Sequence, residues 1–258
     1  MKQTLPRNKI YFLSDAHLGA PYIKDPKAHE ARLVHFLDRI KDDAKEIYFL
    51  GDIFDFWYEW KHIVPKGFIR FQGKVAELVD SGIKVHFFGG NHDMWMFSYF
   101  QKELGVDVYH QPTLVDIDGK TFFLAHGEDL GVDDRLFKAM LRLFRASWFR
   151  WLFSTFVPPS WTMRFAKSWS VKSRKRHGHQ EGLKYLGEDK ENLVQFAKSH
   201  KSTQHIDYFI FGHRHIMLDL MLKKDSRVII LGDWIRHFSY AVVENGQLQL
   251  TDINAQKQ

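Results

Sequence analysis

An α/β fold is predicted for this chain of 258 residues, on the basis of three observations. Short apolar runs rich in β-branched and aromatic residues recur along the chain, and each ends in polar residues. Amphipathic helical patterns separate the first runs, at the spacing expected of strand–helix–strand units. The chain is also long enough to bury a sizeable core, and no internal repeat divides it. We therefore expect one large α/β domain with helices on its outer faces.

Six apolar runs are expected to form buried strands, and they cover residues 9–17, 46–52, 84–93, 120–127, 205–215 and 227–234. Helical patterns lie between the early runs, at roughly 27–44, 66–81 and 94–104. Near the C-terminus, Asn245-Gly246 separates two alternating segments, which is typical of a β-hairpin. The run at 46–52 ends in Gly51-Asp52, which favours a central strand that opens onto a site.

A helical insert is predicted between His126 and His205. From Arg135 to Phe153, basic residues fall within an arc of about 140° and apolar residues fill much of the opposite side, as in an amphipathic helix. Val157-Pro158-Pro159 should end this helix, and Ser160 can cap a second one that runs from Trp161 to about Ser173. We expect a core formed by 1–134 and 182–258, with 135–181 as an inserted helical hairpin.

The net charge of +6 is concentrated in this insert, which has eleven Lys and Arg residues between Arg135 and Arg176 and no acidic residue up to Gln180. Ten aromatic residues lie between Phe137 and Trp169. Such a segment suits a ligand that is both anionic and apolar, or an anionic membrane surface. Two alternatives stay open: the basic side is merely solvated, or it binds single-stranded nucleic acid.

The absence of cysteine excludes disulfides and thiolate ligands, so any metal must be held by His, Asp, Asn or Glu. The N-terminus has no apolar core of about 7–15 residues, so no secretory signal is expected. No uncharged run approaches the roughly 20 residues that span a bilayer. We therefore expect a soluble cytoplasmic protein.

The strand ends carry a recurring set of possible metal ligands. In order, they read Asp15-x-His17, Gly51-Asp52-x-x-Asp55, Gly90-Asn91-His92-Asp93, His126-Gly127 and Gly212-His213-x-His215. Each fragment alone could be a helix cap or a core histidine. Loops at the carboxyl ends of parallel strands converge, however, so ligands distant in sequence can meet there. Two histidines separated by one residue lie on the same side of an extended segment and could share a site. Oxygen and imidazole ligands without thiolate favour Mn, Fe, Zn or Mg.

These five blocks, which span residues 15 to 215, resemble the calcineurin-like metallophosphoesterases. The resemblance implies a four-layer αββα sandwich with two divalent cations, of which Mn²⁺ is the first expectation and Fe or Zn the alternatives. It assigns the first metal to Asp15, His17, Asp52 and His215, and the second to Asp52, Asn91, His126 and His213. Asp52 would bridge both metals, and Asp55 would support its loop. His92 would stabilise charge or protonate the leaving oxygen, and Asp93 would either orient His92 or cap a helix.

Within that family the chain is most similar to the UDP-2,3-diacylglucosamine hydrolases of lipid A synthesis. The shared features are the total length, a helical insert between the fourth and fifth blocks, and the stretch HGEDLGVDD at 126–134. The resemblance implies that Asp134 binds substrate and that the insert acts as a lid for the acyl chains. The residues of the insert expected to contact the substrate are Arg164, Lys167, Ser168, Lys172 and Lys175. The chain departs from the best-known branch of these enzymes at His92, where that branch has arginine.

The implied reaction is attack of water on the α-phosphorus of UDP-2,3-diacylglucosamine, which gives UMP and 2,3-diacylglucosamine 1-phosphate. The implied location is the cytoplasm, with peripheral contact to the inner face of the inner membrane. Two other functions remain open at this point. The chain could be a metallophosphoesterase for another phosphodiester or phosphomonoester, such as a nucleotide or phospholipid, or it could be a non-catalytic metal-binding scaffold.

Overall fold

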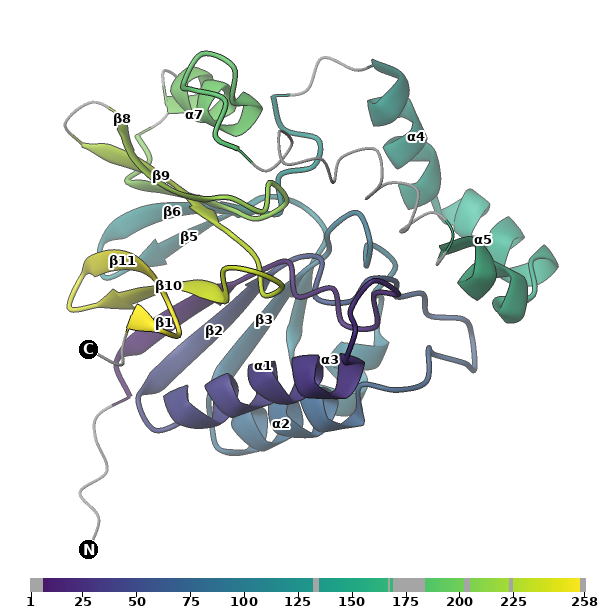
Figure 1. The fold of residues 1–258 in the computed structure, drawn as a ribbon. Helices are drawn as coiled ribbons and strands as arrows, with labels where there is room; N and C mark the ends of the chain where they lie inside the picture. Colours follow the sequence, from purple (N-terminus) through teal and green to yellow (C-terminus); the bar gives the residue numbers. More distant parts are fainter. Residues whose placement is uncertain are drawn as a thin grey trace, which may run out of the picture.

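The computed structural model describes residues 7–131, 135–166, 168, 184–201, 205–222 and 225–255. The described strands form two mixed sheets that pack face to face (Figure 1). The six-stranded sheet has the order β11-β10-β1-β2-β3-β4. Its strands are β1 (Lys9–Leu13), β2 (Ala44–Leu50), β3 (Lys84–Phe88), β4 (Asp107–Tyr109), β10 (Ser239–Glu244) and β11 (Gln247–Asp252). Strands β1 to β4 are parallel, and β10 pairs with β1 in the antiparallel sense.

The five-stranded sheet has the order β5-β6-β7-β9-β8. Its strands are β5 (Thr113–Ile117), β6 (Lys120–Ala125), β7 (Tyr208–Phe211), β8 (Met217–Leu222) and β9 (Ser226–Leu231). The three central strands β6, β7 and β9 are parallel, whereas β5 and β8 pair in the antiparallel sense at the two edges. The β10–β11 hairpin predicted from Asn245-Gly246 is confirmed.

Helices cover the outer faces, so the layers run helix, sheet, sheet, helix (Figure 1). The six-stranded sheet is covered by α1 (Pro26–Ile40), α2 (Ile69–Asp80) and α3 (Tyr99–Leu104), and the five-stranded sheet by α7 (Asn192–Lys201). Strand alternation decides which side chain enters which layer. On β1, Tyr11 and Leu13 pack against the helices, whereas Phe12 packs between the sheets against Tyr48 and Phe122. This core holds the strand ends in fixed relative positions.

The segment that follows β6 differs from the single long helix predicted for 135–153. It forms α4 (Arg135–Arg145) and α5 (Ser147–Phe156), followed by a helical segment at 159–166. The chain breaks at Ala146, whose backbone is extended at φ −69° and ψ 131°. Contacts with the core hold this junction: Trp95 donates to the Phe144 carbonyl at 3.0 Å, and Tyr58 donates to the Arg150 carbonyl at 2.9 Å. Tertiary contacts thus interrupt a pattern that contains neither glycine nor proline at that point.

Candidate metal centre

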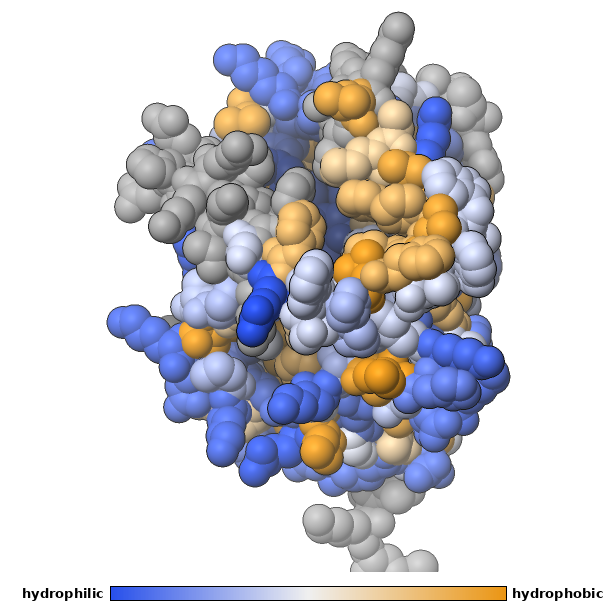
Figure 2. Space-filling view, turned by 90° about the vertical axis from the view of Figure 1, so that its right-hand side faces the viewer, coloured by the Kyte–Doolittle hydropathy of each residue, from blue (hydrophilic) through white to orange (hydrophobic). Residues whose placement is uncertain are grey.

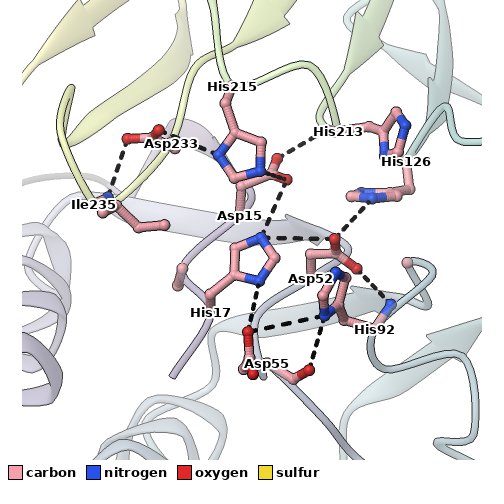
Figure 3. Close-up of polar contacts among 12 residues, drawn as sticks. Asp15, His17, Asp52, Asp55, His92, His126, His213, His215, Asp233 and Ile235 are labelled. Carbon is pink, nitrogen blue, oxygen red and sulfur yellow. Dashed lines mark hydrogen bonds and ion pairs between the residues drawn. The ribbon is translucent and has the colours of Figure 1, made fainter. Parts of the chain in front are cut away.

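The predicted ligands converge at one edge of the sheets, as expected for loops at the carboxyl ends of parallel strands (Figure 3). Among the described residues, three groups of His and Asp side chains could hold a metal ion, each with ligand atoms within 4.8 Å of one another. Two of them match the two predicted metal sites closely. The first triad consists of Asp15, His17 and His215, and the second of Asp52, His126 and His213. The third group joins His17 to Asp55 and His92.

Left-handed backbone conformations direct these side chains. The φ angles are 54° at Asp15, 45° at His17 and 52° at Asp52, and they are 65° at His213 and 50° at His215. Such conformations cost about 1–2 kcal/mol for each residue other than glycine, so the surrounding structure must impose them. The extended geometry expected for the His213-x-His215 pair is therefore wrong, whereas the assignment of these two histidines to different metals, which the family resemblance implies, matches the triads. As a result, His213 and His215 do not share one site but turn into the two adjoining triads.

Two glycines allow the loops to approach the ligands closely. A Cβ on Gly51, which has φ +86°, would lie 2.6 Å from Nδ1 of His126. A Cβ on Gly90 would lie 2.2 Å from Oδ1 of Asp52. The Gly-Asp and Gly-Asn pairs seen in the sequence thus have a steric cause: any side chain at the glycine would enter the space of a ligand.

The histidines use Nδ1 for outer contacts and turn Nε2 inward. The His126 Nδ1–H donates to the Leu50 carbonyl at 2.8 Å, and its Nε2 lies 3.3 Å from Oδ2 of Asp52. The His215 Nδ1–H donates to Oδ2 of Asp233 at 3.1 Å, and its Nε2 lies 3.4 Å from Oδ1 of Asp15. Fixing one ring nitrogen in this way leaves the other as the ligand atom.

Several buried polar atoms of these residues have no hydrogen-bond partner within the described structure. They are Oδ1 of Asp15, both ring nitrogens of His17, Oδ1 of Asn91 and Nε2 of His126. Buried polar atoms without partners are rare because each costs about 1–3 kcal/mol. These five are among twelve such side-chain atoms in the described structure, and they are gathered on residues predicted to hold metal. Oxygen and imidazole atoms are suitable ligands for Mn²⁺, Fe or Zn²⁺. The residues therefore fit a pair of divalent cations.

The charges of the site point the same way. Burial opposes ionisation of Asp52, yet His126 and His92 hold the pKa of its carboxyl well below the ordinary range. Burial would lower the pKa of His126, but the charge of Asp52 beside it raises that pKa well above its ordinary value. Burial and the neighbouring His126 lower the pKa of His213 to about 3, so this ring is neutral. The carboxylates attract positive charge, and a bound cation would replace the proton that His126 otherwise carries.

Neither role expected for Asp93 matches the structure: it does not orient His92, and it caps no helix of the described residues, since α3 begins only at Tyr99. The Asp93 carboxylate accepts backbone N–H groups of Asp52, Ile53 and Phe54 at 2.8–3.2 Å, and that of Gly90 at 2.8 Å. It therefore fixes the loop that carries Asp52. The His92 Nδ1–H instead donates to the backbone carbonyl of Asp55 at 2.8 Å.

Asp55 also faces a metal-site histidine, because its Oδ1 lies 3.5 Å from Nδ1 of His17. The sequence-based prediction that Asp55 supports the Asp52 loop did not include this contact. Asp233 is not among the residues predicted for the site. The apolar run at 227–234 nevertheless ends in Gly232-Asp233, just as the run at 46–52 ends in Gly51-Asp52. That repeated strand-end pattern is the signal that could have identified Asp233.

Four of the predicted substrate-binding residues, Asp134, Lys167, Lys172 and Lys175, lie outside the described residues. Arg164 is exposed on the helical segment at 159–166, and the Ser168 hydroxyl donates to the Arg164 carbonyl at 3.0 Å. Arg145 links α4 to the loop after β6, because its guanidinium pairs with the carboxylates of Glu128 and Asp129. These ion pairs tie the C-terminal end of α4 to the loop that follows His126.

The sequence profile of the family described as Calcineurin-like phosphoesterase matches residues 8–217 of the chain. A UDP-2,3-diacylglucosamine hydrolase from Porphyromonas gingivalis is 46% identical, and the match covers 95% of this chain and 97% of that protein. Proteins with the same description from Histophilus somni and Aeromonas salmonicida are 25% and 27% identical, over 88% and 93% of this chain and 92% and 91% of theirs. With its two mixed sheets and paired His/Asp triads, the chain belongs to the calcineurin-like phosphoesterases.

Proposed function

We propose that this chain hydrolyses the pyrophosphate of UDP-2,3-diacylglucosamine to UMP and 2,3-diacylglucosamine 1-phosphate, by attack of water on the α-phosphorus. The observation that carries the proposal is the 46% identity, over nearly the whole of both chains, to a UDP-2,3-diacylglucosamine hydrolase. The paired triads supply the site that a phosphoester hydrolase needs. The apolar and basic insert beside them suits a substrate that is both a lipid and a phosphate ester.

The first metal would be held by Asp15, His17, Asp52 and His215, and the second by Asp52, Asn91, His126 and His213. Divalent cations bound by these residues would supply Lewis-acid charge for the phosphoryl oxygens and would lower the pKa of the attacking water. The protein's part is to hold the ligands rigidly. The Asp52 carboxylate is held through Oδ1, which accepts the His92 backbone N–H at 2.9 Å, and its Oδ2 lies 3.3 Å from Nε2 of His126 and 3.6 Å from Nε2 of His17, so Asp52 would contribute to both sites.

His92 is the proposed proton donor to the leaving oxygen. Its Nδ1–H is held by the Asp55 carbonyl, so Nε2 is the ring atom left to exchange a proton with the substrate. The ring stacks edge-on against His17 with centroids 4.7 Å apart, which places it beside the first triad (Figure 3). A positively charged imidazole there would also stabilise the charge that develops on the phosphoryl group.

The insert, which we assign to 135–181, is proposed to be the lid over the acyl chains. Figure 2 shows hydrophobic side chains gathered over the face of the molecule on which α4 and α5 lie. The exposed apolar side chains of this patch are Leu136, Leu143, Trp148, Trp151, Leu152, Phe156, Trp161 and Phe165. So large an apolar surface usually marks a binding site. Arg164, Ser168, Lys167, Lys172, Lys175 and Asp134 would contact the polar part of the substrate.

The same patch is proposed to rest on the cytoplasmic face of the inner membrane, where the lipid substrate resides. No helix in the described ranges is long and apolar enough to cross a bilayer. Trp151 is 63% exposed and Phe156 is 70% exposed, and basic residues of α4 lie nearby in sequence. Aromatic side chains flanked by Lys and Arg bind anionic bilayer surfaces. The double variant Trp151→Asp/Phe156→Asp should therefore reduce cosedimentation with anionic vesicles, whereas Ile69→Asp, at an exposed position of α2 outside the patch, should not.

The function is tested by assaying UMP release from UDP-2,3-diacylglucosamine in detergent with Mn²⁺. Release by the parent protein, lost in Asp52→Ala and His92→Ala, is the expected result. Charge reversal in the insert should abolish turnover of the lipid but spare a small chromogenic phosphodiester. Activity on the small ester without any on the lipid would keep the hydrolytic site but refute the substrate. Inactivity on both, with metal bound, would refute the catalytic function itself.

A further inference from the structure

Asp233, at the end of β9, is a buried carboxylate that touches a proposed metal ligand. Its side chain is fully buried, and its Oδ2 lies 3.1 Å from Nδ1 of His215 (Figure 3). Its Oδ1 accepts the backbone N–H groups of Ile235, Arg236 and His237 at 3.0, 2.7 and 3.1 Å. The two oxygens thus have separate partners: Oδ1 closes the loop after β9, and Oδ2 meets the imidazole.

We propose that Asp233 is a positioning residue that holds His215 in the Nδ1–H form, so that Nε2 is presented to the first metal. The Nε2 atom of His215 lies 3.4 Å from Oδ1 of Asp15, on the side of the ring opposite Asp233. An imidazole that donates Nδ1–H to a carboxylate is held in one tautomer and becomes a stronger ligand through Nε2. This proposal concerns the metal centre and does not depend on which phosphoester is cleaved.

The surroundings of Asp233 leave its Oδ2 dedicated to this contact, because Oδ1 is occupied by the three loop N–H groups. Nδ1 of His237 lies 3.5 Å from Oδ1 and so does not compete for Oδ2. The next residue ties the same loop to the first triad, because the Trp234 N–H donates to the Asp15 carbonyl at 3.1 Å. The loop is therefore rigid where it meets His215.

Asp55 occupies the corresponding place at the other histidine of the first triad, with its Oδ1 3.5 Å from Nδ1 of His17. The second triad lacks this arrangement at His126, whose Nδ1–H donates to a backbone carbonyl. Two carboxylates thus lie behind the histidines of the first triad. Asp233 has the shorter contact of the two and is the better one to test, since its other oxygen is independently occupied.

The test is Asp233→Asn. Asparagine retains one oxygen for the three loop N–H groups and turns its amide NH₂ toward His215. An amide that donates to Nδ1 forces the proton to Nε2, where it blocks metal ligation. Mn²⁺ titration of chelator-treated protein should show about a 10–100-fold loss of affinity. The melting temperature of the metal-free variant should match that of the parent. Asp207→Asn is the matched control, because Asp207 accepts the Thr121 N–H at 2.8 Å but touches no predicted ligand.

A second measurement does not depend on how the variant folds. Long-range ¹H–¹⁵N spectra of the Zn²⁺-loaded parent protein should show His215 protonated at Nδ1 and bound through Nε2. Ligation through Nδ1 would overturn the proposal outright. Unchanged Mn²⁺ affinity in folded Asp233→Asn would also overturn it, as would an equal loss in Asp207→Asn, because either result would reduce Asp233 to a structural role.

Discussion

Gly90→Ala should disable the site by displacing Asp52. An added Cβ would lie 2.2 Å from Oδ1 of Asp52 and 2.6 Å from its backbone nitrogen. Ordinary contacts begin near 3.4 Å, so the carboxylate must move by about 1.2 Å. The carboxylate has little room to move, because it is buried and its Oδ1 accepts the backbone N–H of His92 at 2.9 Å. Displacement of a catalytic group by about 1 Å costs roughly 10²-fold in rate, or about 2.7 kcal/mol of transition-state stabilisation.

The matched control is Gly73→Ala in α2, where a Cβ meets nothing within 4 Å. That substitution should leave activity unchanged and stabilise the protein by about 0.5–1 kcal/mol, because alanine is the better helix former. The assay is hydrolysis of a small phosphodiester with Mn²⁺, read beside metal content and the circular dichroism of each variant. Gly90→Ala protein that is folded, fully metallated and within threefold of the parent rate would refute the reasoning.

Three further predictions follow from the site and the core. His92→Ala should lose about 10²–10⁴-fold in rate while keeping its metal content, since the ring is assigned to proton transfer; loss of metal instead would contradict that role. Chelation should lower the melting temperature, and added Mn²⁺ should restore it, because Mn²⁺ at 1,000 times its dissociation constant adds about 4 kcal/mol to the free energy of unfolding. A melting temperature that does not change with Mn²⁺ would argue against a metal centre. Contact with His86, whose Nε2 lies 3.4 Å from Oε2, and the hydrogen bond that the Tyr48 hydroxyl donates outweigh burial and lower the pKa of Glu46 to about 2. Because this folded-state value lies below the unfolded one of 4.5, the resulting stability is present above pH 4.5 and is lost as pH falls toward 2. In Glu46→Gln, the free energy of urea unfolding should fall less steeply over that pH interval than in the parent, and an unchanged pH slope would count against the pair.

The central strands could be predicted from the sequence because they are buried on both faces and therefore read as continuous apolar runs. The edge strands β4, β5 and β8 are not predicted, because they are partly exposed and lack such a run. Strand β8 alternates exposed Met217 and Met221 with partly buried residues, and β4 has only three residues. Their pairing is decided by the sheet that they join and not by their own composition.

The helices show the corresponding limit. The predicted helix at 94–104 begins only at Tyr99, because Glu59 accepts the N–H groups of Ser98 and Tyr99 and fixes that start from a distant loop. The break at Ala146 likewise depends on the docking of Trp95 and Tyr58. Both boundaries are set by partners remote in sequence, which no local pattern records.

The metal-site residues were predictable as a set, but the separate roles of the aspartates were not. Asp15, Asp52, Asp93 and Asp233 all lie at strand ends, and only their hydrogen bonds distinguish them. Asp93 gives both oxygens to backbone N–H groups and has no capacity left for a cation.

Asp15 and Asp52 divide their oxygens differently. In Asp15, Oδ2 accepts the backbone N–H of His213, and Oδ1 faces Nε2 of His215. In Asp52, Oδ1 accepts the backbone N–H of His92, and Oδ2 faces Nε2 of His126. Asp233 also has one oxygen facing an imidazole, but it meets Nδ1, the side of the ring away from the site. A strand-end carboxylate is thus a candidate ligand when one oxygen faces Nε2 of a site histidine, and a support when its oxygens meet Nδ1 or backbone N–H groups.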